Sequence, residues 1–129
     1  MRVEGTGELL GFERLEVWQR AVRFAQLIYE ITRTFPRDEL FGLTSQLRRA
    51  SVSVAANIAE RASRSSRKDQ ARFFEIAYGS LNEVATMLYI SKLEDFVTED
   101  SWMSTRQDIM KMCRMLSGLK HAAVGVSKA

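Results

Sequence analysis

Apolar residues recur every three or four positions through four long segments of this chain. That spacing places them on one face of an α-helix, whereas a half-buried strand would need strict alternation. The pattern breaks only at Pro36, at the polar run Ser63-Arg-Ser-Ser-Arg67 and near Glu94. Because the 129 residues include one proline and seven glycines, the chain lacks the turn chemistry of sandwiches and barrels. The sequence therefore predicts an all-α fold.

The breaks define four expected helices, at residues 12–35, 38–63, 67–93 and 99–122. Pro36 ends the first helix, because a proline disfavours helical geometry in the residue before it. Ser66 is the expected N-cap of the third helix, with Asp69 three residues on as in a capping box, and Thr98 is the expected N-cap of the fourth. Short connections between long helices favour antiparallel neighbours, so we expect an antiparallel up-down-up-down four-helix bundle. We assign the bundle to residues 12–122, a flexible N-terminal tail to 1–11 and a C-terminal tail to 123–129.

The first and third helices carry more apolar surface than one core face requires. On the first, a row that contains Val17 and Phe24 lies next to a second row that contains Trp18 and Val22. On the second helix the expected core contacts are Leu40, Leu43, Leu47, Val54 and Ile58. The excess apolar arc on the first and third helices predicts that copies of this chain contact one another in a homo-oligomer.

Residues that carry catalysis are scarce. The one histidine, His121, lies near the chain end, where a helix-end cation is the expected role. The one cysteine, Cys113, falls on an inward row and is expected to be a small buried hydrophobe. A di-metal carboxylate bundle needs two Glu-x-x-His pairs, which the chain lacks, and no Gly-rich phosphate loop is present. We expect no catalytic residue, no metal, no cofactor and no enzymatic activity.

The same residues bear on the cellular compartment. A single cysteine excludes a disulfide within the chain and fits a reducing cytoplasm. The first residues lack the apolar core of a signal peptide, and no run approaches the roughly 18 apolar residues of a membrane span. We expect a cytoplasmic protein with no membrane partner.

Basic residues gather in the middle of the chain. They are Arg48, Arg49, Arg61, Arg64, Arg67, Lys68 and Arg72, opposed by Glu60 and Asp69, in a chain whose net charge is only +3. Most of them flank the join between the second and third helices, so we expect them to converge at one end of the bundle. Arginine forks match phosphate oxygens, and binding them releases counterions, which predicts a nucleic-acid-binding cluster. The alternative is a solvated hinge with salt bridges inside the subunit. No aromatic residue is interleaved with these arginines, which argues against base stacking.

A polar line runs along the second expected helix among small apolar residues. Ser53, Asn57 and Glu60 share one helical face, and burying them is unfavourable unless each finds a partner. They could line a pore or contact a ligand. We favour the alternative, a buried hydrogen-bonded network that sets helix or subunit register. The expected partners of Glu60 are Arg48, Arg49 and Arg61.

Several motifs together resemble one family. They are Phe12-Glu-Arg-Leu-Glu-Val-Trp18, Tyr29, Phe35-Pro36, Leu43-x-x-Gln46-x-x-Arg49-Ala50, Ser53-Val-x-x-Asn57-Ile-Ala-Glu60 and Ala77-x-Gly79-Ser80-Leu81-x-Glu83. The combination resembles the bacterial four-helix-bundle proteins encoded in intervening sequences of 23S ribosomal RNA genes, over about residues 11–122. One position departs: Arg61 stands where the family places glycine.

The resemblance implies a cytoplasmic homopentamer with a basic surface or channel and no established catalytic activity. A related bundle is the accessory protein of diversity-generating retroelements, which binds a reverse transcriptase and RNA. Our leading hypothesis is a non-enzymatic homo-oligomeric bundle that binds RNA or other structured nucleic acid through the basic cluster. The alternative is a protein-interaction scaffold or accessory subunit, for example of a reverse transcriptase, without nucleic-acid binding of its own.

Overall fold

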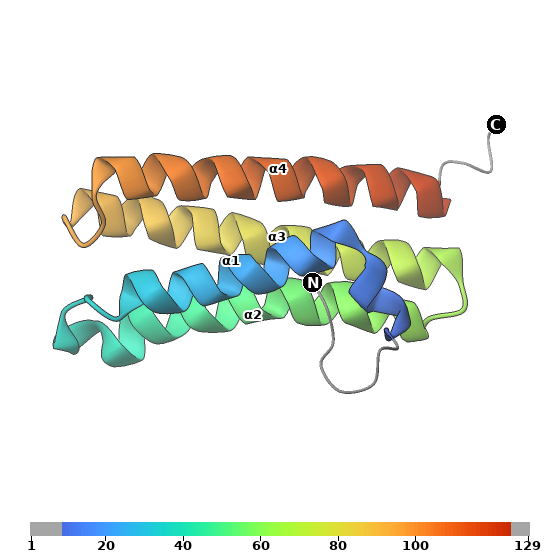
Figure 1. Ribbon diagram of the computed structural model, residues 1–129, viewed down its shortest axis with the longest axis horizontal. Coiled ribbons are helices and arrows are strands. Elements are labelled where there is room, and N and C mark those ends of the chain that lie inside the picture. Colours follow the sequence, from blue (N-terminus) through green and yellow to red (C-terminus); the bar gives the residue numbers. More distant parts are fainter. Residues whose placement is uncertain (1–8, 125–129) are drawn as a thin grey trace.

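Four α-helices form an antiparallel bundle in the computed structural model, which describes residues 9–124 and the side chains as far as residue 119. They are α1 Glu16–Thr32, α2 Ser45–Glu60, α3 Arg67–Leu93 and α4 Glu99–Val124. Each helix runs opposite to the one before it, and α1 also contacts α4, so the bundle closes (Figure 1). Residues 9–124 contain no strand. The predicted all-α fold class is confirmed.

The third and fourth helices begin where their caps predict. The Ser66 hydroxyl accepts a hydrogen bond from the Asp69 N–H at 3.0 Å, and α3 starts at the next residue, Arg67. The Thr98 hydroxyl accepts from the Ser101 N–H at 3.1 Å at the start of α4. These side chains satisfy donors that the first helical turn leaves unpaired. The tails predicted for residues 1–11 and 123–129 lie largely outside the described residues.

The first expected helix is not continuous. A 3₁₀ turn, η1 Gly11–Arg14, comes first, then Leu15 is extended with φ −73° and ψ 123°, and α1 begins at Glu16. The Phe12 ring folds back against the Trp18 ring, with centroids 5.1 Å apart. This aromatic contact requires the chain to bend between the two residues, which a straight helix does not allow.

The second expected helix also begins later than predicted. A 3₁₀ turn, η2 Arg37–Glu39, and a π turn, η3 Leu40–Thr44, precede α2, and a 3₁₀ turn, η4 Arg61–Ser63, follows it. Gly42 is non-helical, with φ −112° and ψ −114°, and a Cβ there would lie 2.9 Å from a Glu39 carboxylate oxygen. That carboxylate accepts the Leu43 N–H at 3.1 Å, so the side chain takes the place of a helical bond.

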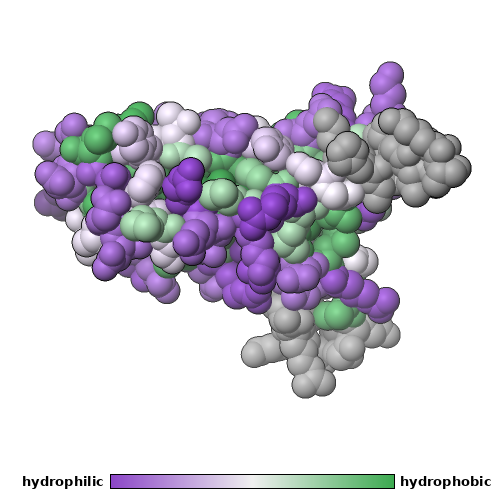
Figure 2. Space-filling view, turned by 90° about the horizontal axis from the view of Figure 1, so that it is seen from above, coloured by the Kyte–Doolittle hydropathy of each residue, from purple (hydrophilic) through white to green (hydrophobic). Residues whose placement is uncertain are grey.

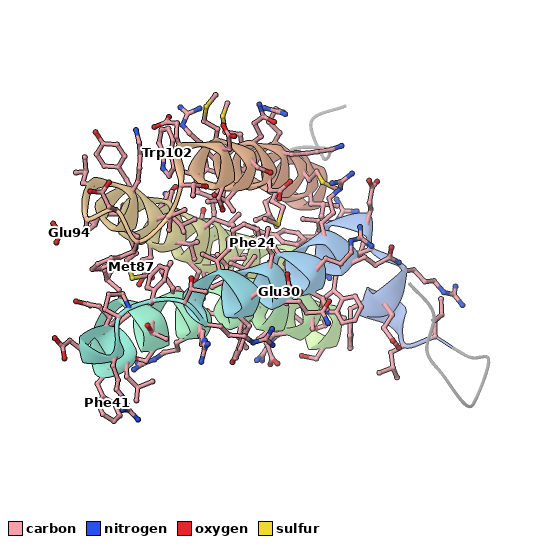
Figure 3. All side chains as sticks on the ribbon, turned by 60° about the vertical axis from the view of Figure 1, so that its left-hand side comes forward. Phe24, Glu30, Phe41, Met87, Glu94 and Trp102 are labelled. Carbon is pink, nitrogen blue, oxygen red and sulfur yellow. The ribbon has the colours of Figure 1, made fainter. Side chains whose placement is uncertain are left out.

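The kink places two apolar side chains in solvent. Leu40 is 48% exposed, and Phe41 is 89% exposed and points away from the helices (Figure 3). The prediction that Leu40 belongs to the core is therefore wrong. The other expected core residues of this segment, Leu43, Leu47, Val54 and Ile58, do pack in the core or against it.

One apolar row from each helix makes the core. Fully buried members include Phe24 and Ile28 of α1, Val54 of α2, Leu81 of α3 and Leu116 of α4. The second rows of α1 and α3 stay partly in solvent, as Tyr29, Ile76 and Ile90 show. The face over α4 is mainly hydrophilic, with hydrophobic side chains in small areas between the polar ones (Figure 2). A single row per helix is enough to close the bundle.

Two leucines seven residues apart test this division. We expect Leu47→Ala, at a side chain with 0% exposure, to lower the free energy of unfolding by about 2–5 kcal/mol because it leaves a cavity. Leu40→Ala, the matched change at the kink, should cost about 1 kcal/mol or less. Urea unfolding followed by circular dichroism measures both. Equal losses in the free energy of unfolding would show that Leu40 belongs to the core after all.

Candidate functional site

The seven basic residues of the expected cluster do not lie together. Arg48 and Arg49 are in the first turn of α2, whereas the other five occupy η4, the α2–α3 turn and the first turns of α3. At 1.5 Å per residue, Arg48 and Arg61 are about 20 Å apart along the helix. The expectation of one cluster is corrected to a group of five at one end of the bundle and a pair at the other.

Arg48 is engaged in holding α2 against α1. Its guanidinium carbon lies 4.7 Å from the centroid of the Tyr29 ring. Its Nε donates to the Thr32 hydroxyl at 2.9 Å, and its Nη2 lies 3.5 Å from the Tyr29 carbonyl oxygen. These contacts occupy the fork that would otherwise be available to a phosphate.

At the α2–α3 turn the fold brings two aromatic rings to the arginines. The guanidinium carbon of Arg64 lies 4.7 Å from the centroid of the Phe73 ring, and that of Arg61 lies 5.3 Å from the centroid of Phe74. The expectation that no aromatic residue is interleaved with these arginines is wrong for the folded chain, because two of them contact phenylalanine rings. Phe73 and Phe74 directly follow Arg72 in the sequence, but only the fold shows that they contact Arg64 and Arg61, across the turn.

Side-chain contacts hold this turn in one conformation. The Ser63 hydroxyl donates to the Glu60 carbonyl at 2.9 Å, and the Gln70 amide donates to the Arg64 carbonyl at 3.0 Å. Arg61 itself has φ −53° and ψ −34°, an ordinary right-handed conformation that does not call for glycine. The arginine at this position is thus accommodated without backbone strain.

Three cations of the group remain exposed. Arg67, Lys68 and Arg72 reach solvent from the first turns of α3. Within the described residues their side chains form no ion pair and no hydrogen bond, whereas Glu60 is paired with Arg64 at 2.5 Å. The exposed positive charge of the turn is therefore concentrated on these three residues.

The polar line on α2 is partly a network. The hydroxyls of Ser53 and Ser80 are 3.0 Å apart, which links α2 to α3, and the Asn57 amide donates to the Ser53 hydroxyl at 3.0 Å and to the Ser53 carbonyl at 2.8 Å. Ser80 was not predicted as a member. Its signal is a polar residue among the buried apolar positions of α3, next to Leu81 and three residues after Ala77.

Glu60 does not belong to this network. Its side chain is 48% exposed, and its ion-pair partner is Arg64, one helical turn on, in place of the expected Arg48, Arg49 or Arg61. Residues four apart on a helix face each other, so this pairing needs no tertiary contact. Among the described residues, the network on α2 therefore consists of Ser53 and Asn57, with Ser80 of α3.

A groove of about 630 Å³ runs along the outer side of α1 and α2. The second row of α1, including Trp18 and Val22, forms one wall, and Val52 and Ala56 of α2 form the other. Glu30, which points away from the bundle while Phe24 points into it, stands at its edge (Figure 3). The apolar excess predicted on the first helix is thus at the surface, beside small residues of α2.

Cys113 is half-buried, and burial raises the pKa of its thiol, against smaller lowering effects of a hydrogen bond to Tyr78 and of the Arg114 charge. The side chain of His121 lies outside the described residues. Among those residues no three of the types His, Cys, Asp and Glu are grouped to hold a metal ion. None of the described helices has a stretch apolar enough, at sufficient length, to cross a bilayer.

These features define an all-α antiparallel four-helix bundle with a cationic turn at one end and an apolar groove along one side. Residues 13–118 match the family model of the 23S rRNA-intervening sequence proteins, and the chain belongs to that family. No curated protein matches it.

A solved structure supports the fold. The chain is similar to a crystal structure of a protein of unknown function from the S23 ribosomal protein family, from Bacteroides thetaiotaomicron VPI-5482. The TM-score is 0.75 at 23% sequence identity, over 81% of this chain and 94% of that one. At this identity the likeness shows the fold alone.

The Ser53 network and the Glu60 ion pair are expected to differ in stability. Ser53→Ala removes a hydroxyl that contacts both Ser80 and Asn57, so it should lower the free energy of unfolding by about 1 kcal/mol. Glu60→Gln breaks an exposed pair one turn apart and should cost about 0.3–0.5 kcal/mol. Denaturant unfolding of the two variants measures the difference. A larger loss in the free energy of unfolding for Glu60→Gln than for Ser53→Ala would show that Glu60 belongs to the network.

Proposed function

We propose that this protein is a non-enzymatic, cytoplasmic module that binds RNA or other structured nucleic acid through its phosphates. The supporting observation is the α2–α3 turn, where Arg61, Arg64, Arg67, Lys68 and Arg72 outnumber the acids near them, Glu60, Asp69 and Glu75. Three of these cations have no ion pair among the described residues. Lysine and arginine at such a site bind phosphates by releasing condensed counterions.

The arrangement favours recognition by charge and shape. The Ser66 cap and the Gln70 hydrogen bond hold the turn, so its cations are presented from a rigid end of the bundle. Contacts to phosphates position a nucleic acid without reading its sequence. Arg48 and Arg49, at the other end of α2, have no part in this binding mode.

Assembly is the second element of the proposal. The family resemblance implies a homopentamer, and the groove along α1 and α2 supplies an apolar surface for contact between copies. A ring of subunits would repeat the cationic turn around one axis. Repetition would raise the local potential and so strengthen binding of a polyanion.

The same groove supports the alternative function. An apolar surface of this kind also fits a protein partner, in which case the chain acts as a scaffold or accessory subunit, for example of a reverse transcriptase. Binding would then depend on residues such as Val22 and Val52 and little on the cations of the turn. Salt separates the two, because phosphate binding weakens steeply with ionic strength and apolar binding does not.

Binding to structured RNA at about 50 and 200 mM salt tests the phosphate proposal. A protein that neutralises several phosphates should lose roughly 10³-fold in affinity over this range. The triple variant Arg67→Gln, Lys68→Gln, Arg72→Gln should reduce the slope of log affinity against log salt by about 2–3. Fluorescence anisotropy with a labelled RNA hairpin measures both.

A matched control removes the same charges elsewhere. Arg23→Gln, Lys111→Gln, Arg114→Gln takes two arginines and one lysine from exposed positions on α1 and α4 and should leave the slope close to that of the unmodified protein. Equal effects of the two triple variants would mean that binding depends on the overall positive charge of the protein and not on the cations of the turn. Absence of binding at 50 mM salt would sink the proposal, and a protein partner retained at high salt after nuclease treatment would support the scaffold.

Assembly has its own test. Val52→Glu places a charge in the groove, at a side chain that is 45% exposed, so the monomer should fold while copies separate. Ser104→Glu adds the same charge to an exposed position on α4 and should leave assembly unchanged. Sedimentation equilibrium should give a mass near five times the chain's 14.7 kDa for the unmodified protein and one times for Val52→Glu. A monomeric unmodified protein would contradict this part of the proposal.

A further inference from the structure

Two arginines of the cationic turn are held against aromatic rings. The Arg64 guanidinium carbon is 4.7 Å from the Phe73 ring centroid, and that of Arg61 is 5.3 Å from Phe74. Both distances fall within the range of a cation–π contact. Each ring therefore supports one side of a guanidinium group and restrains its orientation.

The Nε atoms of Arg61 and Arg64 have similar surroundings. The Nε atoms of both are buried and have no hydrogen-bond partner among the described residues. The Arg64 side chain nevertheless remains 40% exposed, and its Nη2 is held by Glu60 at 2.5 Å. Phe73 and Glu60 contact the Arg64 guanidinium, and the part of the side chain that they leave uncovered reaches solvent.

An orientation fixed before binding lowers the cost of binding. Glu60 and Phe73 restrain Arg64 at its edge and its face, while the Gln70 amide holds the Arg64 carbonyl. A free arginine loses side-chain entropy when it is ordered by a ligand, and here much of that loss is already incurred. The turn thus presents restrained guanidinium groups, in contrast to Arg67 and Lys68 next to them, which are exposed and form no ion pair among the described residues.

A flat guanidinium surface is suited to an unpaired nucleobase. Bases that are not stacked in a helix pack on arginine planes and aromatic rings, and every base has a π-face that can do so. The backbone of the same strand would meet the exposed cations Arg67, Lys68 and Arg72. A duplex offers only phosphates at this point, since its bases are already stacked.

The geometry points to Arg61 and Arg64 as stacking residues for unpaired bases, with Phe73 and Phe74 as their supports, so that the turn prefers a single strand over a duplex. This inference rests on the proposed phosphate binding and adds a substrate class to it. Arg61 and Arg64 then differ in role from Arg67, Lys68 and Arg72, which contact the backbone by charge.

A charge-preserving substitution tests the inference. Lysine keeps the positive charge of arginine but has no plane to stack, so Arg64→Lys removes stacking while phosphate attraction remains. Affinity is measured at about 100 mM salt for a labelled 20-nucleotide oligouridine, whose bases are unstacked, and for a blunt 20-base-pair RNA duplex. Arg61→Lys is measured in parallel. Arg114→Lys, at an exposed position on α4 outside the turn, is the matched control, and thermal unfolding confirms that all variants are folded.

Arg64→Lys is expected to weaken oligouridine binding about 10-fold, consistent with the loss of one stacked base, and to leave duplex binding within about twofold. Arg114→Lys should change neither. Equal weakening for both ligands would mean that Arg64 acts as a fork on phosphates and would overturn the inference, as would no change for either ligand. The same loss in Arg114→Lys would show a general preference for arginine and would also overturn it. If the unmodified protein binds neither RNA, the proposed function itself fails.

Discussion

Burial of one apolar row from each of four helices is the interaction on which the rest of this structure depends. The row on α1 that contains Phe24 and Ile28 meets those of α2, α3 and α4 in a single core. Each helix has about one third of its surface in that core, as amphipathic helices of bundles do. Once the core is closed, the second apolar row of α1 stays partly in solvent and lines a groove with Val52 and Ala56. The proposed assembly and the alternative binding of a protein partner would both use the apolar surface of this groove.

The α2–α3 hairpin connects the core to the candidate site. Ser53 and Ser80 join the two helices by a hydrogen bond inside a mostly apolar contact, which specifies how they align. That alignment sets where α2 ends relative to α3, and so which rings lie beneath the arginines of the turn. Arg61 and Arg64 rest on Phe74 and Phe73 as a consequence of helix packing. The site is therefore a product of register as well as of charge.

Local signals in the sequence anticipated much of this. The caps at Ser66 and Thr98 act within a few residues, and α3 and α4 begin where expected, whereas α1 ends at Thr32, short of the break at Pro36. The start of α2 was missed, because a glutamate side chain, Glu39, replaces a helical bond at Gly42. No propensity reveals that replacement, and the exposure of Leu40 and Phe41 followed from it.

The sequence by itself determined the fold class, the number and direction of the helices and the family, because helical periodicity and capping are short-range properties of the chain. Only the tertiary structure decided which charges share a surface. It left Arg48 apart from Arg61, beside Tyr29 of α1, and brought two phenylalanines under two arginines. Such neighbours are set by how helices pack, and residues far apart in sequence meet only when the core closes.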